Sequence, residues 1–383
     1  MLQGGALDTR MGRPYAAFSI RDGGTTRAMN EPRWHRMARV GEPRGSAGRL
    51  AFGVLAALVV SACSGSGGTS SSVTFTSWGG SYQDGQVKAW IQPYEKETGT
   101  RVIQDSPTDY SKLRTMVEAG RVTWDVVSVE ADFGLDVDKK WLDPIDYSVV
   151  DRTHIQEGMA DPYRVGILTY AVVLGYNTGS LGGRTPTGWG DFFDPQRFPC
   201  KRAAQKKASS GILEIALMAD GVKPADMYPI DVDRALRRLD TIKKDLLWFD
   251  TGSEGQQLLA SGEVCMAAIF SGRVYSARND DKAPVGITWN QPVISADYLV
   301  VPKGTPHEVA AMKLIAYITS AGPQSRLSRY LPYAPANTEA STDPATAPYL
   351  TTNHLDGSVR FDDQWWAQNF SAVDERFQAW LLG

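Results

Sequence analysis

Aromatic and acidic side chains stand at the ends of predicted strands, where a parallel sheet binds its ligands. Trp78 closes a strand predicted over 73–78 and precedes a double glycine, with Tyr82 close behind. Glu130 follows a third predicted strand, over 125–129. Aromatic rings in a crevice bind aliphatic chains through apolar contact and cations through their π faces. The three residues therefore indicate a pocket for a small aliphatic or cationic ligand.

No catalytic signature accompanies these residues. The chain has no G-x-S-x-G, S-x-x-K, H-E-x-x-H or phosphate-binding G-x-x-x-x-G-K-[ST] sequence. Beyond position 63 the histidines are His154, His307 and His354, far apart in the chain, which disfavours a histidine metal site or a catalytic triad. We therefore expect no enzyme, no metal and no cofactor. A secreted hydrolase that uses two carboxylates stays open as an alternative.

Alternating strands and helices precede and follow these residues. Strands are expected over 73–78, 101–104 and 125–129, with helices near 87–94 and 113–117 between them. Pro93 conflicts with the first helix, because proline lacks the N–H that a helix interior requires. The alternation predicts a parallel sheet with helices on both faces.

The later elements are expected from the same periodicities. A strand over 169–176 is predicted to cross between two lobes. Thr305 and Glu308 form a capping-box pattern before another helix. The remaining expected elements are helices over 212–219 and 232–247 and strands over 263–270, 285–289 and 298–301.

An apolar run, Leu50–Ala62, precedes the body of the chain and follows three arginines. Thirteen residues span about 20 Å as a helix, too short for a hydrocarbon core of about 30 Å, so the run is typical of a secretory signal peptide. It ends in Val60-Ser-Ala-Cys63, which resembles the bacterial lipobox and implies lipid on Cys63. Residues 63–72 are then a flexible leash. The alternative to the signal peptide is a buried core helix with an ordinary cysteine at position 63. Translation is expected to begin near Met37.

Charge and length describe the rest of the chain. Residues 1–62 hold nine Lys and Arg and four Asp and Glu, so the whole-chain charge of −3 leaves −8 for the other 321 residues. An acidic body argues against a nucleic-acid partner. This length suits two lobes. Cys200 and Cys265 form either a disulfide in an oxidising compartment or two buried thiols, and their spacing does not decide between them.

An ordered series of segments resembles the extracellular solute-binding proteins of ABC importers, in the spermidine/putrescine-binding branch. The segments are SWGGSY at 77–82, YEKETG at 94–99, SADYLVVPKGTPHEVAAMKLIAYI at 295–318 and YLPYAPAN at 330–337. The resemblance implies a two-lobed α/β fold of type II, with discontinuous lobes joined by crossing strands. The expected lobes are 73–170 with 297–340, and 171–296 with 341–383.

The resemblance also implies a ligand site, matched position by position. Asp297 corresponds to the amine-binding aspartate of the family, with a turn or capping aspartate as the alternative. Trp366 corresponds more loosely to a late contact. The expected ligand-binding residues are Trp78, Tyr82, Glu130, Phe270, Arg273, Asp297 and Tyr333.

Two features depart from a polyamine site. The stretch 208–212 lacks the acids that polyamine binders place there, and Arg273 stands beside the expected pocket. A guanidinium repels a dication and binds a carboxylate with two hydrogen bonds. Arg273 could instead pair with a structural acid or face solvent. The first expectation is a polyamine such as putrescine or spermidine, and the alternative is a zwitterionic ω-amino acid such as 4-aminobutyrate.

The sequence therefore predicts a non-enzymatic receptor that captures a small amine and delivers it to the membrane subunits of an ABC permease. It is expected to be a monomer, exported to the periplasm or the outer cell surface and held at a membrane through Cys63.

Overall fold

The computed structural model describes residues 72–383, which belong to one compact unit. The predicted signal peptide and Cys63 lie outside the described residues. Within 72–383 no helix is long and apolar enough to cross a membrane.

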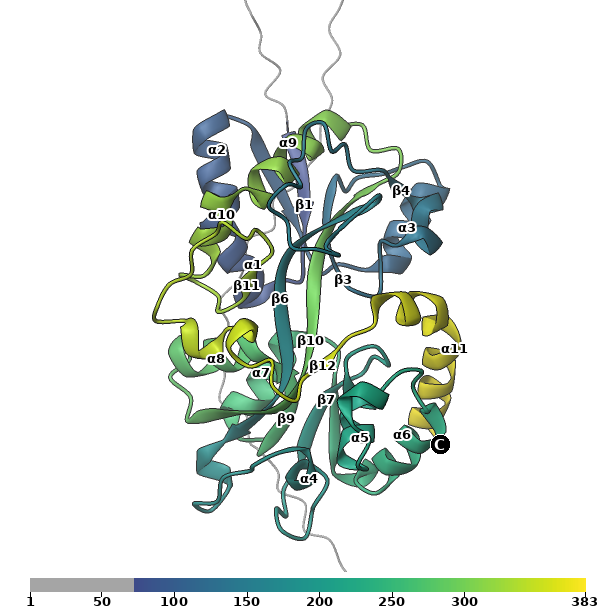
Figure 1. Cartoon of the computed structure of the whole chain (residues 1–383), viewed down its shortest axis with the longest axis vertical. Helices are drawn as coiled ribbons and strands as arrows, with labels where there is room; N and C mark the ends of the chain where they lie inside the picture. The colour runs from purple at the N-terminus through teal and green to yellow at the C-terminus, as the bar shows by residue number, and fades with distance from the viewer. Residues whose placement is uncertain (1–71) are drawn as a thin grey trace, which may run out of the picture. The chain divides into compact units, whose positions relative to one another are not determined.

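The first half of the described chain builds the upper group of elements in Figure 1. The three parallel strands β1, β2 and β3 alternate with helices, as the sequence predicts. The elements are β1 (Ser72–Thr76), α1 (Gly80–Gln86), a π-helical turn (Val87–Ile91), α2 (Gln92–Thr98), β2 (Arg101–Asp105), α3 (Tyr110–Glu118), β3 (Val126–Glu130), a 3-10 helix (Asp136–Trp141), β4 (Leu142–Asp143), β5 (Ala160–Asp161) and β6 (Arg164–Asn177).

The second half builds the lower group, then returns to the upper one through β10 and descends again to α11 (Figure 1). Its elements are α4 (Trp189–Phe192), β7 (Arg202–Gln205), α5 (Ile212–Ala219), α6 (Val232–Asp240), β8 (Leu246–Phe249), α7 (Gly252–Ser261), β9 (Met266–Phe270), α8 (Ser271–Asn279), β10 (Val285–Pro302), α9 (Glu308–Thr319), α10 (Ala321–Leu327), β11 (Ala334–Pro335), β12 (Val359–Arg360) and α11 (Asp363–Leu382). Short 3-10 helices cover 178–180, 224–226, 243–245, 347–349 and 351–353.

Two long antiparallel strands, β6 and β10, join the groups. The strand order is β2-β1-β3-β10-β6-β9-β7-β8, so these two strands occupy the centre. Their residues are buried along most of their length. The two-lobed type II architecture that the sequence predicts is therefore present, with the lobes joined by crossing strands.

Several predicted bounds are wrong. The strands expected over 285–289 and 298–301 are one strand, β10, because the polar segment Asn290-Gln-Pro292 stays within it at a register irregularity. The helix expected over 232–247 ends at Asp240, and the consecutive apolar residues of β8 leave the helical period. The Thr305 hydroxyl accepts from the His307 N–H and does not cap Glu308.

Pro93 is accommodated by the π-helical turn that separates α1 from α2. A proline cannot donate to the carbonyl four residues earlier, which is that of Ala89. The Ala89 carbonyl oxygen instead accepts a hydrogen bond of 2.9 Å from Arg326 Nε. Helix α10 thereby supplies the missing donor, and the helix continues through the proline.

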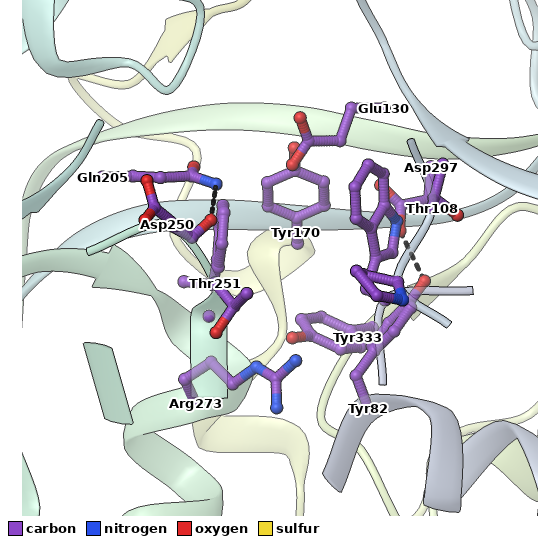
Figure 2. Close-up of a pocket in the computed structure, with 14 residues that line it drawn as sticks. Tyr82, Thr108, Glu130, Tyr170, Gln205, Asp250, Thr251, Arg273, Asp297 and Tyr333 are labelled. Carbon is purple, nitrogen blue, oxygen red and sulfur yellow. Dashed lines mark hydrogen bonds between the residues drawn. The ribbon is translucent and has the colours of Figure 1, made fainter. Parts of the chain in front are cut away.

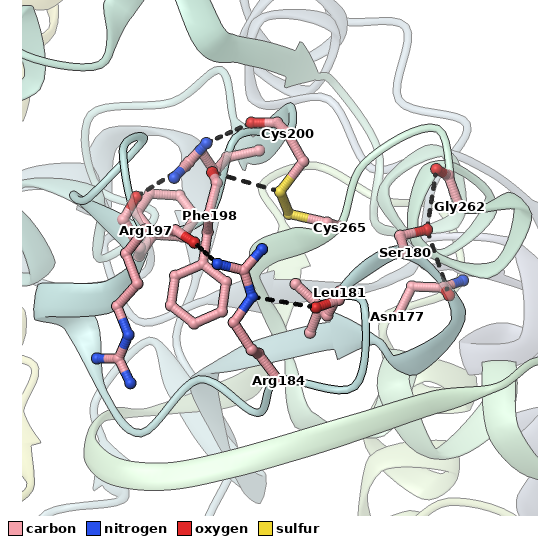
Figure 3. The surroundings of a disulfide bond; sticks show 11 residues. Asn177, Ser180, Leu181, Arg184, Arg197, Phe198, Cys200, Gly262 and Cys265 are labelled. Carbon is pink, nitrogen blue, oxygen red and sulfur yellow. Dashed lines mark hydrogen bonds between the residues drawn. A yellow bond between two sulfur atoms is a disulfide. The ribbon is translucent and has the colours of Figure 1, made fainter.

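Cys200 and Cys265 form a disulfide with a Cα–Cα distance of 6.0 Å (Figure 3). Cys200 precedes β7 and Cys265 precedes β9, and these strands are parallel neighbours that pair Arg202 with Met266. The sheet register therefore brings the two cysteines together.

Removal of the disulfide is predicted to destabilise the fold. The bond closes a loop with a sequence separation of 65 residues, for which loop entropy gives a stabilisation of about 4 kcal/mol. The Cys200→Ser/Cys265→Ser variant, and the wild type with reductant, should unfold at lower urea concentration, followed by circular dichroism. Reductant should leave the midpoint of the double variant unchanged. Equal midpoints for oxidised and reduced wild type would contradict the prediction.

Candidate functional site

A cavity of about 240 Å³ lies where the two lobes face each other across β6 and β10 (Figure 2). The structure brings all seven ligand-binding residues expected from the sequence to its wall. The lining residues are Trp78, Tyr82, Pro107, Thr108, Glu130, Tyr170, Gln205, Asp250, Thr251, Gly252, Phe270, Arg273, Asp297 and Tyr333.

Aromatic rings form the apolar wall of the cavity. Tyr170 on β6 lies edge-to-face against Phe270 and Tyr333, with centroid distances of 5.3 and 6.4 Å. Tyr82 on α1 contacts Tyr333 in the same way, at 5.7 Å. A Cβ at position 272 would lie 2.2 Å from the Tyr333 hydroxyl, so Gly272 permits this close packing. Such a wall suits the methylene chain of an aliphatic ligand.

Asp297 supplies a buried carboxylate on β10. The register between β10 and β6 slips between Asp297 and Tyr298, and such a bulge re-aims a side chain. The Tyr82 hydroxyl donates to Asp297 Oδ2 at 2.5 Å, whereas Oδ1 is buried without a hydrogen-bond partner. Burial, and then the charge of Glu130, raise the pKa of Asp297 well above its usual range. A ligand cation would pair with this carboxylate and favour its charged form.

Arg273 supplies a buried guanidinium in the first turn of α8. Its Nη1 donates to the hydroxyls of Ser81 at 3.0 Å and Ser253 at 3.3 Å, and Nη2 donates to the Gly79 carbonyl at 3.4 Å. Only 4% of the residue is exposed, and no ion pair of the described residues includes it. The two alternatives, a structural acid partner or a solvent-facing side chain, are therefore excluded for the described residues.

The surroundings of Arg273 favour an anion. Burial lowers the pKa of its guanidinium, since desolvation penalises the charged form. The N-terminus of α8 adds positive potential at the same place, where Ser271 Oγ is buried without a partner. Figure 2 shows Arg273 and Glu130 on opposite sides of the cavity. A ligand carboxylate would satisfy the guanidinium with charge-assisted hydrogen bonds.

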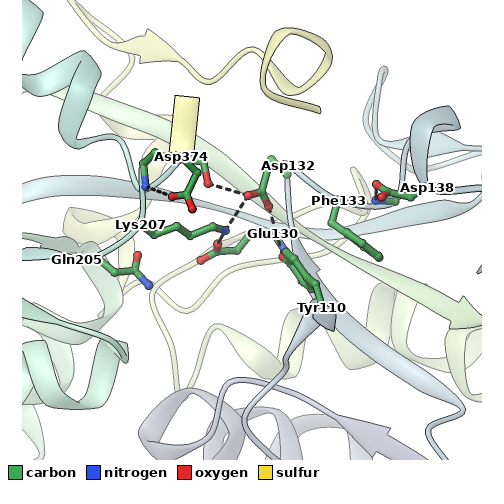
Figure 4. Close-up of polar contacts among 12 residues, drawn as sticks. Tyr110, Glu130, Asp132, Phe133, Asp138, Gln205, Lys207 and Asp374 are labelled. Carbon is green, nitrogen blue, oxygen red and sulfur yellow. Dashed lines mark hydrogen bonds and ion pairs between the residues drawn. The ribbon is translucent and has the colours of Figure 1, made fainter. Parts of the chain in front are cut away.

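Glu130 lines the cavity but is already paired within the protein (Figure 4). Lys207 Nζ lies 2.5 Å from Glu130 Oε2 and 2.7 Å from Asp132 Oδ2. Of the expected carboxylates, Asp297 is therefore the one that keeps a free buried oxygen.

Sequence reasoning missed several lining residues. Tyr170 sits in the middle of a crossing strand that was recognised without a ligand role. Gln205 ends β7, and Asp250 follows the end of β8. Trp78 was identified because it stands at the end of a strand. The same signal would have identified Gln205 and Asp250 if the strands over 202–205 and 246–249 had been predicted.

Trp366 does not reach the cavity, so its loose match was wrong. Its side chain is fully buried and stacks on Phe361, and its Nε1 donates to Glu214 Oε1 at 2.8 Å. Glu214 also lies outside the cavity lining, so the stretch 208–214 places no acid there, but Asp250 of the second lobe does line the cavity. Within 72–383 no group of three potential ligands is placed to hold a metal.

Two lobes joined by crossing strands, with a small polar and aromatic cavity between them, define a periplasmic-binding-protein-like receptor for a small solute. The chain belongs to the bacterial extracellular solute-binding protein family, whose model matches residues 89–352. It is accordingly a solute-binding protein of an ABC transporter, and its family indicates an exported location.

Several similar proteins are named for the ligand that they bind. A gamma-aminobutyric acid-binding protein of Pseudomonas aeruginosa is 32% identical over 328 residues, which cover 81% of this chain and 91% of that protein. A putrescine/agmatine-binding protein of the same organism is 25% identical, over 64% of this chain and 74% of that protein. The solved structure of the Atu4243-GABA receptor is 42% identical, with a TM-score of 0.74, and the match covers 81% of this chain and 97% of that one.

Replacement of Asp297 by asparagine is predicted to stabilise the ligand-free protein at neutral pH. Because folding raises the pKa of Asp297, its ionisation destabilises the folded state as pH rises above about 4, by at most about 1.4 kcal/mol per pH unit. Asparagine does not ionise and still accepts from Tyr82. Urea unfolding should show Asp297→Asn above wild type at pH 7, with the gap closing toward pH 4.

The matched control for this measurement is Asp250→Asn, which changes an exposed carboxylate of the same cavity. Its urea midpoint at pH 7 should match that of wild type. A wild type more stable than Asp297→Asn at pH 7 would show that the protein itself stabilises the Asp297 anion.

Proposed function

We propose that this protein captures 4-aminobutyrate, or an ω-amino acid close to it, and delivers it to the permease of an ABC importer. The proposal rests on two buried groups of opposite charge, Arg273 and Asp297, which line one cavity and have no charged partner there within 72–383. Arg273 has no acidic partner among the described residues, and Asp297 has a free carboxylate oxygen. A molecule with a carboxylate at one end and an ammonium at the other satisfies both.

The charges argue against the polyamine expectation. A polyamine has two or more ammonium groups and no carboxylate, so it would leave Arg273 unpaired and would meet its repulsion. Glu130, the second acid expected for a polyamine, is paired with Lys207. The 32% identical relative is named for gamma-aminobutyric acid, and the putrescine-named relative is more distant at 25%.

The remaining parts of the proposal come from the sequence. Lipid on Cys63 would tether the exported, monomeric receptor to a membrane through the leash at 63–72. The lobes, 73–170 with 297–340 and 171–296 with 341–383, would close on the ligand about β6 and β10, as hinge-bending receptors do. The proposed ligand-binding residues are Trp78, Tyr82, Glu130, Tyr170, Phe270, Arg273, Asp297 and Tyr333.

A ligand series tests whether both charges of the ligand are needed. Isothermal titration calorimetry should show binding of 4-aminobutyrate, with n-butylamine and butyrate each at least about thirtyfold weaker. The reason is that leaving one member of a buried charge pair unpartnered costs about 2–5 kcal/mol. The ligand should be recovered unchanged. Equal affinity for n-butylamine would remove the carboxylate from the proposal, and steady conversion of the ligand would favour the hydrolase.

Arg273→Ala separates a zwitterion from a polyamine. The variant should lose 4-aminobutyrate binding by about thirtyfold or more, because the ligand carboxylate loses its cation. Putrescine affinity should stay equal or improve, since a repulsive charge is removed. Arg278→Ala is the control, because Arg278 is an exposed arginine of the same helix, α8. Retained 4-aminobutyrate affinity in Arg273→Ala would exclude Arg273 from the site.

A further inference from the structure

A partly buried lysine, Lys207, connects the two lobes next to the cavity-lining Glu130. Lys207 lies in the connection between β7 and α5, in the second lobe, whereas its partners Glu130 and Asp132 lie at the end of β3 in the first. Ser209, two residues after Lys207, donates to Asp132 Oδ2 at 2.7 Å. Figure 4 shows the three charged groups converging.

The Lys207 ammonium is surrounded by carboxylates and aromatic rings, the same groups that would bind the ammonium of a ligand. Two carboxylates hold it, and the rings of Tyr110 and Phe370 lie 5.4 and 5.9 Å from Nζ, at cation–π distance. Its pKa is raised, because Asp132 and Glu130 outweigh the effect of burial. The chain itself therefore supplies the cation that pairs with these two carboxylates.

Glu130 makes this cation relevant to the ligand. It lines the cavity, whereas Lys207 and Asp132 do not. Glu130 and Asp297 are register partners on the adjacent strands β3 and β10, so their side chains are direct cross-strand neighbours. Without Lys207 the cavity would present two neighbouring carboxylates, an arrangement suited to a diamine.

We infer that Lys207 is a specificity-determining residue, whose tethered ammonium neutralises Glu130 in place of a second ligand ammonium and so excludes diamines. The inference rests on the proposed function, because it explains why a fold shared with putrescine binders would accept a ligand with a single ammonium. Asp297 remains for that ammonium, and Arg273 faces the carboxylate.

Calorimetry with putrescine and 4-aminobutyrate tests the inference. Lys207→Gln should bind putrescine at least about tenfold more tightly than wild type, because Glu130 is released to pair with a ligand cation. Lys207→Arg keeps a cation and should keep the exclusion. Lys206→Gln, a change in the exposed neighbouring lysine, should leave both affinities unchanged.

Two double variants separate specificity from mere loss of structure. Lys207→Gln/Asp132→Asn removes one charge of each sign and leaves Glu130 free, so it should fold and should gain putrescine binding. Lys207→Gln/Glu130→Gln lacks the Glu130 carboxylate and should bind putrescine no more tightly than wild type. Unchanged putrescine affinity in both Lys207→Gln and Lys207→Gln/Asp132→Asn would overturn the inference. A wild type that fails to bind 4-aminobutyrate would overturn the proposed function instead, and the putrescine comparison would still stand.

Discussion

The site depends on two opposite charges that the protein buries and does not pair with each other. Asp297 and Arg273 both line the cavity, but no ion pair joins them. Each is held by neutral donors or acceptors alone: the Tyr82 hydroxyl for the carboxylate, serine hydroxyls and a carbonyl for the guanidinium. Burying an unpaired charge is unfavourable, and the proposed zwitterion would supply a partner of opposite sign to each group. The same two unpaired charges would then account both for the affinity for a zwitterion and for its selection over ligands with a single charge.

The crossing strands β6 and β10 keep Asp297 and Arg273 apart. Asp297 is fixed by β10, whose bulge next to β6 sets its direction, while Arg273 is fixed by α8, which follows β9 on the other side of β6. Asp297 lies within the sheet itself, Arg273 lies in the first turn of the helix that follows β9, and β6, which carries Tyr170, is the strand between β10 and β9. A site built on strands and helix starts holds its groups more firmly than one built on loops.

How much of this could be read from the sequence follows from the range of each signal. Trp78 and Tyr82 were found because strand ends and glycines are local, and Asp297 because its segment resembles a family. Lys207 was missed because its role depends on carboxylates about eighty positions earlier in the chain, and no local pattern records such a contact. Trp366 was misplaced since an aromatic residue has the same local signature in a core as in a pocket. The predicted bounds were wrong at β8, where a run of apolar residues was taken as part of a helix, and at β10, where a polar segment was taken as a break in the strand.

The polar groups that we propose to select the ligand also join the lobes. Lys207 from the second lobe pairs with Glu130 at the end of β3 and with Asp132 just after it, and Arg273 from the second lobe reaches Ser81 and Gly79 of the first. Separation of the lobes would return all of these groups to water, where charge pairs are weak. In the proposed hinge closure, the ligand would favour the closed form only by the difference between its affinities for the closed and open forms. If the ligand is the proposed zwitterion, opening of the lobes would weaken the contacts to its ammonium and to its carboxylate together, and this would release it to the permease.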